Sequence, residues 1–492
     1  MATPIPKNDV RFSIAEIVTA TAGRLVGGTA DVGGVELDGV AIDSRAVSAG
    51  ALFVAVRGDT QDGSKYIPAA LAAGAGALLV PASEPAVASY PDSVARIEVE
   101  DTTRALGDLA AYHRQRWGGR VVAITGSAGK TTTKELTAAA LEGAGAHVLK
   151  TLGNLNNQFG VPMMLLCATE QHDTAVLELG TSGPGEIARL GEIARPQVAV
   201  VLLAALAHTE GLVSLAAVAD EKASLWAALG ADGTAIINAD DVELMQRAPR
   251  NVKLLSFGSR EGATVRLLGS TLKVTGTRTQ VAIDGIGELE FDLRMLGHAA
   301  AIDACAAIAT VLALFAESDR LPAVEAAVRA MEKVEPTPGR MACIATRSGV
   351  TVCDDSYNAN PRSMSLGLET LHALAQQAGG RSIAVVADMK DLGLFAHSEH
   401  VRIGELAVRL GIDVLVGCGV EMAHATSAAG RLSGGRLAPH PTRVAHVMTP
   451  SDAVALVQGM CRSGDVVLVK GSRAMEMDKV VAALVASFGG AA

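Results

Sequence analysis

Apolar residues in this chain gather in short runs that are separated by segments with helical spacing. In the middle of the sequence such runs predict strands at 121–125, 175–179, 198–203 and 235–238, and the spacing at 215–229 predicts a helix between two of them. Strands that alternate with helices are typical of a parallel sheet covered on both faces. The middle of the chain is therefore expected to be a layered α/β unit.

The same alternation restarts after Pro336 and Pro338, which interrupt the helical pattern and predict a hinge. Beyond them we expect strands at 350–354, 383–387, 414–417 and 466–470, and helices at 364–376, 398–410, 453–461 and 475–486. Before the middle unit, alternation at 50–56 and an Ala/Gly-rich segment at 69–77 predict a strand and a helix, and 117–120 reads as a linker. These breaks predict three α/β domains: a small one at 1–115, a central one at 116–335 and a Rossmann-like one at 336–492.

Composition narrows the class of protein. The apolar run at 198–207 is shorter than the ~20 residues of a membrane-spanning helix, and the first residues lack the apolar segment of a secretory signal. We therefore expect a cytoplasmic protein with no membrane insertion. The net charge of −10 argues against nucleic acid as a partner. The six cysteines form no CxxC pair and are expected to be buried thiols in a reducing compartment, with no zinc site.

The segment AITGSAGKTTTK at 123–134 follows a predicted strand and opens a predicted helix. Glycines let the backbone approach phosphate oxygens, and the N–H groups at the start of a helix face the anion. The residues expected to bind nucleotide phosphate are Gly126, Ser127, Ala128, Gly129, Lys130, Thr131 and Thr132. The strict P-loop pattern requires glycine where Ile124 stands, so this is a variant of that loop. Kinases, ATPases and ligases all use such loops, so the loop alone leaves the reaction open.

Further motifs follow in order along the chain. They are DSR at 43–45, FVAVRG at 53–58 with DG at 62–63, GNLNNQFGVP at 153–162, ELGTSGPGEI at 178–187, AHTEG at 207–211, DEK at 220–222, DDSYNANP at 354–361, DMKDLG at 388–393 and LVKGSR at 468–473. Together with the phosphate loop they resemble the Mur ligase family over essentially the whole chain. The chain departs from the family pattern at Thr209, at Ala387, and after Gly297, where Ala299 and Asp303 occupy positions of an expected His-Asn…Asn motif. The last departure affects the adenine contact that the family motif would supply.

The resemblance implies a reaction and a domain arrangement. In this family ATP phosphorylates a substrate carboxylate, and an amine then attacks the acyl phosphate. The segments at 153–162 and 358–361 favour the branch that joins D-alanyl-D-alanine to UDP-N-acetylmuramoyl-tripeptide. The first domain would bind the UDP-sugar, and the second would bind ATP with Mg²⁺. The third would supply the remaining groups of the ligase site. The protein is expected to be a monomer.

Candidate catalytic residues combine position with this resemblance. Glu178 ends an apolar strand at the carboxyl edge of the predicted sheet, where ligands bind, and is expected to be a Mg²⁺ ligand together with Thr131 and His208. Lys222 stands beside an apolar helical stripe. By resemblance it is a lysine that carries a carbamate, and the alternative is a lysine whose ammonium reaches water.

Binding residues are assigned by motif. Arg340, Asp355 and Asn358 are expected at the nucleotide, with Lys470 and Arg473 available to complete the charge balance. The expected substrate-binding residues are Ser44, Arg45, Asn154, Asn157, Tyr357 and Asn360. The alternative for these loop residues is ordinary surface polarity.

Three other functions compete with this hypothesis. One is a related ligase, such as a folylpolyglutamate synthetase or an enzyme of an earlier Mur step. Another is a non-catalytic nucleotide-binding protein, which the presence of Lys130, Thr131, Glu178, His208 and Lys222 disfavours. The third is a P-loop kinase, which would not need three domains.

Overall fold

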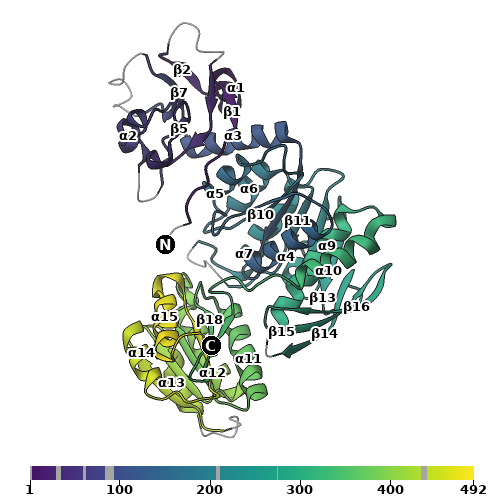
Figure 1. Ribbon diagram of the computed structural model, residues 1–492, viewed down its shortest axis with the longest axis vertical. Helices are drawn as coiled ribbons and strands as arrows, with labels where there is room; N and C mark the ends of the chain where they lie inside the picture. Colours follow the sequence, from purple (N-terminus) through teal and green to yellow (C-terminus); the bar gives the residue numbers. More distant parts are fainter. Residues whose placement is uncertain are drawn as a thin grey trace.

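The computed structural model describes residues 3–28, 35–58, 62–83, 93–206, 211–273, 275–433 and 440–491. Three α/β units follow one another along an arc, from the N-terminal unit at the top of Figure 1 to the C-terminal unit at the bottom. This agrees with the α/β class and the three-part organisation expected from the sequence.

The first unit contains a five-stranded sheet with the order β2-β7-β6-β5-β4 and a separate β1–β3 pair. Its elements are β1 (Arg11–Ser13), α1 (Ile14–Thr21), β2 (Arg24–Val26), β3 (Glu36–Asp38), β4 (Val40–Ala41), β5 (Leu52–Val54), α2 (Ile67–Ala72), β6 (Ala77–Pro81), β7 (Ala95–Val99) and α3 (Thr102–Trp117). The helix predicted at 69–77 is wrong in its second half, because the chain turns at Gly74 and enters β6 at Ala77.

The central sheet has nine strands in the order β16-β15-β14-β13-β12-β11-β8-β10-β9. Its parallel part is built from β8 (Arg120–Thr125), α4 (Lys130–Gly143), β9 (Val148–Lys150), α5 (Gly160–Leu165), β10 (Thr174–Glu178), α6 (Glu186–Ala194), β11 (Val198–Val201), α7 (Leu215–Ala223), β12 (Thr234–Asn238), α8 (Val242–Met245) and β13 (Lys253–Gly258). The four strands predicted here are confirmed. The helix predicted at 215–229 is α7 followed by a 3₁₀ turn, Ser224–Ala228.

An antiparallel extension of this sheet was absent from the sequence-based expectation. It consists of β14 (Val265–Lys273), β15 (Gly276–Ile283) and β16 (Gly287–Leu293), followed by α9 (His298–Leu314) and α10 (Arg320–Met331). Helix α9 packs against α4 on one face of the sheet. The packing brings residues near 300 beside the phosphate loop.

The third unit is a six-stranded sheet with the order β17-β18-β22-β19-β20-β21, parallel except for β17. Its elements are β17 (Ala342–Ala345), β18 (Thr351–Asp355), α11 (Pro361–Ala378), β19 (Ser382–Ala387), α12 (Ala396–Leu410), β20 (Val414–Cys418), α13 (Met422–Leu432), β21 (Arg443–Val447), α14 (Pro450–Gln458), β22 (Val466–Lys470) and α15 (Met477–Ser487). All four strands and four helices predicted for this unit are confirmed within a few residues.

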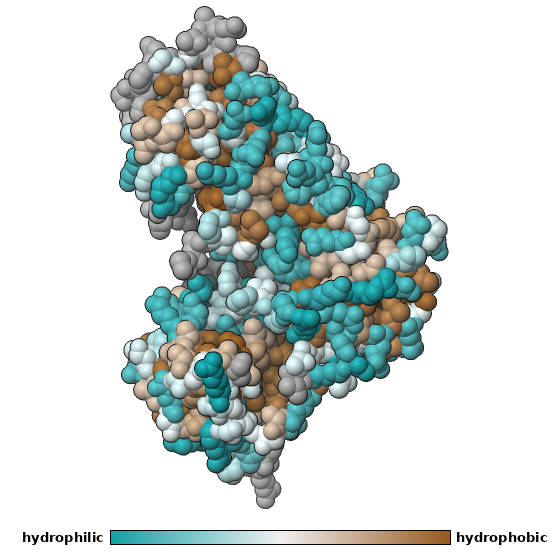
Figure 2. Space-filling view, viewed as in Figure 1, coloured by the Kyte–Doolittle hydropathy of each residue, from teal (hydrophilic) through white to brown (hydrophobic). Residues whose placement is uncertain are grey.

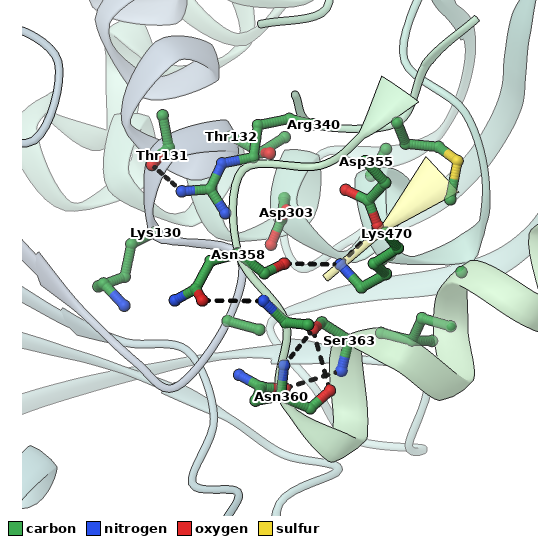
Figure 3. Close-up of a pocket in the computed structure, with 18 of the residues that line it drawn as sticks. Lys130, Thr131, Thr132, Asp303, Arg340, Asp355, Asn358, Asn360, Ser363 and Lys470 are labelled. Atoms are coloured by element: carbon green, nitrogen blue, oxygen red, sulfur yellow. Dashed lines mark hydrogen bonds and ion pairs between the residues drawn. The ribbon is translucent and has the colours of Figure 1, made fainter. Parts of the chain in front are cut away.

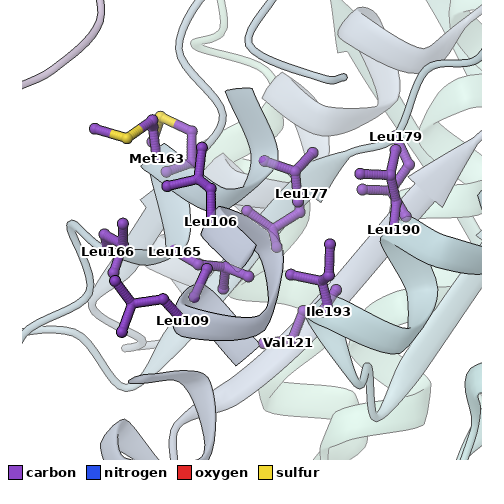
Figure 4. Packing of buried hydrophobic residues seen from close by; sticks show 14 of the residues in the cluster. Leu106, Leu109, Val121, Met163, Leu165, Leu166, Leu177, Leu179, Leu190 and Ile193 are labelled. Atoms are coloured by element: carbon purple, nitrogen blue, oxygen red, sulfur yellow. The ribbon is translucent and has the colours of Figure 1, made fainter. Parts of the chain in front are cut away.

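Helix α3 connects the first unit to the central one through a shared apolar core. Leu106 and Leu109 of α3 face Leu165 of α5 and Ile193 of α6 (Figure 4), and all four are buried in one cluster that also contains residues of the first unit. Burying apolar surface between the two units is favourable at roughly 25 cal/mol per Å². The contact holds the first unit against helices α5 and α6 on one face of the central sheet.

The expectation that all six cysteines are free thiols is wrong for two of them. Cys343 and Cys353 form a disulfide. They are directly opposite each other on the antiparallel strands β17 and β18, so the strand register brings their sulfur atoms together. Cys305 and Cys418 are buried free thiols, and Cys167 and Cys461 are half-buried.

The surface in Figure 2 is largely hydrophilic, and it is hollowed between the first and third units. Within the part of the chain that the structure describes, no helix is long and apolar enough to cross a membrane.

Candidate active site

The phosphate loop joins β8 to α4 at the carboxyl edge of the central sheet. Gly129 precedes the helix with a φ of 83°, which favours glycine, and α4 begins at Lys130. Ser127 anchors the loop, since its hydroxyl donates to the carbonyl of Ala205 and accepts from the Ala205 N–H, both at 3.0 Å. The N–H groups at the start of α4 therefore face the space in front of the sheet, as an anion site requires.

Lys130 lies half-buried at the base of this loop. Its ammonium donates to the carbonyl oxygen of Gly126 at 2.7 Å. Burial lowers the pKa of Lys130, the nearby Glu178 carboxylate acts in the opposite direction, and the Arg340 guanidinium lowers it further. A second cation close to Lys130 means that the site carries positive charge that a polyphosphate would neutralise.

Glu178 is the acidic residue of this edge, and only 2% of its surface is exposed. One carboxylate oxygen accepts from the Thr131 hydroxyl at 3.0 Å, and the other accepts from the Asn156 side chain at 2.8 Å. Thr131 and Glu178 thus place two hard oxygen ligands side by side, which is the kind of donor set that Mg²⁺ prefers. The described residues hold no group of three or more His, Cys, Asp or Glu side chains able to bind a metal. Mg²⁺ at this site would therefore also need water or phosphate oxygens.

The third unit reaches the phosphate loop through two side chains. Arg340, just after the hinge, donates to the Thr131 hydroxyl at 3.3 Å, and Asn360 donates to the carbonyl of Ser127 at 3.0 Å. Figure 3 shows these residues from the two units around one pocket. Asn360 also caps α11 through Ser363, so the start of that helix is fixed where the two units meet.

The loop after β18 supplies the polar wall of the same pocket. Lys470 forms a buried ion pair with Asp355 at 2.7 Å and donates to the carbonyl of Asn358 at 3.0 Å. Two guanidinium groups lie over the Tyr357 ring, with Arg340 4.1 Å and Arg473 5.7 Å from its centroid. Tyr357 therefore orients the arginine that contacts the phosphate loop.

Lys222 lies on α7 behind the phosphate loop and is only 3% exposed. Burial lowers the pKa of Lys222 to about 7, and the charge of Lys130 adds to this effect, while Glu221 and Glu186 oppose it. In the part of the chain described, Lys222 makes no hydrogen bond or ion pair. The alternative of an ammonium group that reaches water does not fit this burial.

Comparison with known proteins supports the family suggested by the motifs. The family models described as Mur ligase family, catalytic domain, Mur ligase middle domain, and Mur ligase, glutamate ligase domain match residues 36–114, 124–311 and 339–473. A relative from Escherichia coli (strain K12), named UDP-N-acetylmuramoyl-tripeptide–D-alanyl-D-alanine ligase, is 36% identical over 478 residues, 96% of this chain and 98% of its own. The chain belongs to the Mur ligase family.

Other members are similar along nearly their whole length. A Bacillus subtilis (strain 168) protein of the same name is 32% identical over 92% of this chain and 94% of its own. The crystal structure of MurF from Acinetobacter baumannii superimposes with a TM-score of 0.85 at 29% identity, covering 97% of this chain and 99% of that one. MurF ligase from Thermotoga maritima in complex with ADP gives 0.78 at 26% identity, with 91% and 97% covered.

Four of the expected substrate-binding residues do not line the pocket formed by the phosphate loop and the third unit. Arg45 is 88% exposed on the first unit and pairs with Asp43, next to Ser44. The Asn154 side chain accepts from the Thr3 hydroxyl, and that of Asn157 accepts from the N–H groups of Phe159 and Gly160. His208 lies outside the described residues.

Sequence reasoning missed two residues of this Mur ligase site. Asn156, which orients Glu178, stands between the two asparagines that were singled out, and only the folded loop distinguishes them. Glu221 accepts from the N–H groups of Gly185 and Ile187, both at 2.7 Å, and so caps α6. The DEK motif at 220–222 contains Glu221 and was the sequence feature that could have drawn attention to this residue.

Proposed function

We propose that this chain is an ATP-dependent ligase that joins D-alanyl-D-alanine to UDP-N-acetylmuramoyl-tripeptide through an acyl-phosphate intermediate. The observation that carries the proposal is the pocket in which the phosphate loop meets Arg340 and the 355–360 loop of the third unit. The names of the relatives similar over nearly the full length support the same substrates.

Phosphoryl transfer to a carboxylate brings anions together, so cations must offset the repulsion. Lys130, the N–H groups at the start of α4 and Arg340 surround the position expected for the β- and γ-phosphates. Ser127, Ala128 and Thr132, which line the same pocket, and Gly126, whose carbonyl accepts from Lys130, are proposed to complete the cradle. A carboxylate oxygen of the tripeptide would attack the γ-phosphorus, and ADP would leave.

Thr131 and Glu178 would hold Mg²⁺, with His208 as a third candidate. The ion would supply charge neutralisation at the phosphate oxygens. Asn156 keeps one oxygen of Glu178 occupied, so the other oxygen is the one turned toward Thr131.

The second half of the reaction is attack by an amine on the acyl carbon. The carbon–oxygen bond to phosphate breaks, inorganic phosphate leaves, and the amine nitrogen loses a proton. Asp355, Tyr357, Asn358 and Asn360 lie on one loop beside the phosphate loop and are proposed to bind the nucleotide and the incoming dipeptide.

Lys222 is proposed to act as a carbamate. Its amine nitrogen would bond to the carbon of CO₂ with loss of a proton, which turns a buried cation into an oxygen ligand near Lys130. Burial favours this reaction because it increases the fraction of neutral amine.

We assign residues 1–115, which include Ser44 and Arg45, to binding of the UDP-sugar. Residues 116–335 would bind ATP, with Asn154 and Asn157 on the side of the tripeptide. Residues 336–492 would bind the amine. The chain would act as a monomer in the cytoplasm, where ATP is available.

The test is phosphate release with defined substrates. The full chain is incubated with ATP, Mg²⁺ and UDP-N-acetylmuramoyl-tripeptide, with and without D-alanyl-D-alanine. Phosphate should appear only when all are present, and should not appear with folate and glutamate or with UDP-N-acetylmuramate and L-alanine. Release that requires one of those other pairs would favour a related ligase.

A further inference from the structure

Lys134 is a buried cation on α4, the helix that begins at the phosphate loop. It lies about one turn after Lys130 and three residues after Thr131, whose hydroxyl donates to Glu178. Only 2% of Lys134 is exposed. A buried ammonium group is unfavourable unless it is paired and hydrogen-bonded, so the partners of Lys134 indicate what its charge does in the fold.

Two oxygen atoms hold the ammonium group of Lys134. Its Nζ lies 2.7 Å from Glu135 Oε1 and donates to the carbonyl oxygen of Thr151 at 2.8 Å. The second carboxylate oxygen of Glu135 pairs with Lys150 at 2.6 Å. Burial acts to raise the pKa of Glu135, but the hydrogen bonds from Lys134 and Lys150 outweigh it and hold that pKa below its ordinary value. Glu135 is therefore an ionised partner that fixes Lys134 beside Thr151.

Thr151 connects this ion pair to the acidic residue of the site. It follows the last residue of β9, and only 1% of it is exposed. Its hydroxyl accepts from the backbone N–H of Glu178 at 2.9 Å, and its own N–H donates to the carbonyl of Val176 at 3.1 Å. The carbonyl of Thr151 is thus held by α4, while its N–H and hydroxyl are held by β10.

The loop that begins after Thr151 contacts Glu178 a second time. Asn156 on this loop donates to Glu178 Oε1 at 2.8 Å, and Thr131 donates to Oε2 at 3.0 Å. Glu178 is therefore held at its backbone by Thr151 and at its side chain by Asn156 and Thr131. Lys134 supports the first two of these contacts, because it fixes the residue from which the loop starts.

We propose that Lys134 and Thr151 are positioning residues that set the orientation of Glu178 toward Mg²⁺. The proposal rests on the proposed function in taking Glu178 as a ligand of the ion. Neither residue lines the nucleotide pocket, so both act through Glu178. Groups that orient a metal ligand typically contribute roughly 10- to 100-fold to metal affinity. Because Lys134 and the phosphate loop share one helix, this arrangement also keeps the metal ligand in register with the bound phosphates.

The experiment measures Mn²⁺ binding to the full chain in the presence of ADP, with free Mn²⁺ read from its electron paramagnetic resonance signal. Mn²⁺ takes the same kinds of oxygen ligand as Mg²⁺. Lys134→Met removes the ammonium group, and Thr151→Val replaces the hydroxyl by a methyl group. Both should raise the dissociation constant of Mn²⁺ by at least ~10-fold.

Two control variants separate positioning from general stability. Lys150→Met removes the other partner of Glu135, and Thr151→Ser keeps the hydroxyl, so both should bind Mn²⁺ like the wild type. The affinity for ADP in EDTA, measured by calorimetry, should be unchanged in all four variants because the phosphate loop is intact.

Thr151→Val leaves the ion pair in place, so it tests the proposal even if Lys134→Met does not fold. Wild-type Mn²⁺ affinity in Thr151→Val, or an equal loss in Thr151→Ser or Lys150→Met, would overturn the proposal. A loss of ADP affinity in EDTA that matches the loss of Mn²⁺ affinity would also overturn it, since Lys134 would then support the phosphate loop as a whole. These results would leave the ligase function intact. A wild type that binds no Mn²⁺ with ADP would contradict the metal site of the proposed function as well.

Discussion

Replacing Lys222 tests whether the buried lysine works as a carbamate. Burial lowers its pKa from the ordinary value of 10.5 to about 7. At pH 7 about half of the amine is then neutral, against roughly 3 in 10⁴ for an ordinary lysine, an increase on the order of 10³-fold. Only the neutral amine reacts with CO₂, so this increase makes carbamylation feasible at physiological pH. It also predicts that activity falls below pH 7, as the amine becomes protonated.

The assay is phosphate release by Lys222→Ala, with the exposed Lys479→Ala as control. We expect Lys222→Ala to lose at least ~10²-fold in rate, the scale for one electrostatic group at a transition state, and Lys479→Ala to be unaffected. Acetate should restore part of the lost rate because it supplies a carboxylate in the vacated space. In ¹³C-bicarbonate the wild type should show a carbamate carbon resonance that is missing in Lys222→Ala. A wild-type spectrum without this resonance, together with no rescue by acetate, would refute the reasoning.

Three further predictions concern the phosphate loop and the hinge. Lys130→Ala should lower the rate of phosphate release by at least ~10²-fold, since it removes a cation from the β/γ-phosphates, and a rate within a few-fold of wild type would remove the loop from the mechanism. Asn156→Ala frees one oxygen of Glu178 and should raise the Mg²⁺ concentration for half-maximal rate by about 10-fold; an unchanged requirement would mean that Glu178 does not bind the ion. Small-angle scattering should show a smaller radius of gyration with an ATP analogue and UDP-tripeptide bound, because reacting atoms must come within ~3–3.5 Å, and an unchanged radius at saturation would argue against closure at residues 336–339.

Parallel strands such as β10, β11, β12, β19, β20 and β22 could be predicted because they are buried on both faces and therefore read as continuous apolar runs. The partly exposed parallel strands β9, β13 and β21 were not predicted. The strands β14 to β16 could not be predicted, since their inward and outward residues alternate irregularly and Thr, Arg and Gln occupy several of their positions. Helix α9 was missed for the opposite reason. Its alanine-rich sequence is apolar on nearly every face, so no helical stripe marks it.

The phosphate loop could be predicted because its ligands are consecutive, whereas the rest of the site depends on contacts between distant segments. Arg340 and Thr131 are 209 residues apart and meet only when the third unit packs against the second. In the sequence, Asp303 was noted only because it departs from a family motif. Its burial and its contact with Gly129 are visible only in the folded structure. The Cys343–Cys353 disulfide likewise depends on the register of two strands.

The central claim, that this Mur ligase activates a carboxylate as an acyl phosphate, can be tested by isotope transfer. UDP-N-acetylmuramoyl-tripeptide with ¹⁸O in its reacting carboxylate is converted with ATP and D-alanyl-D-alanine, and the released phosphate is analysed by mass spectrometry. The carboxylate oxygen that attacks the γ-phosphorus must leave with phosphate when the amine displaces it. The account therefore predicts one ¹⁸O atom in each phosphate formed with an amide bond. Unlabelled phosphate accompanying amide formation would contradict it.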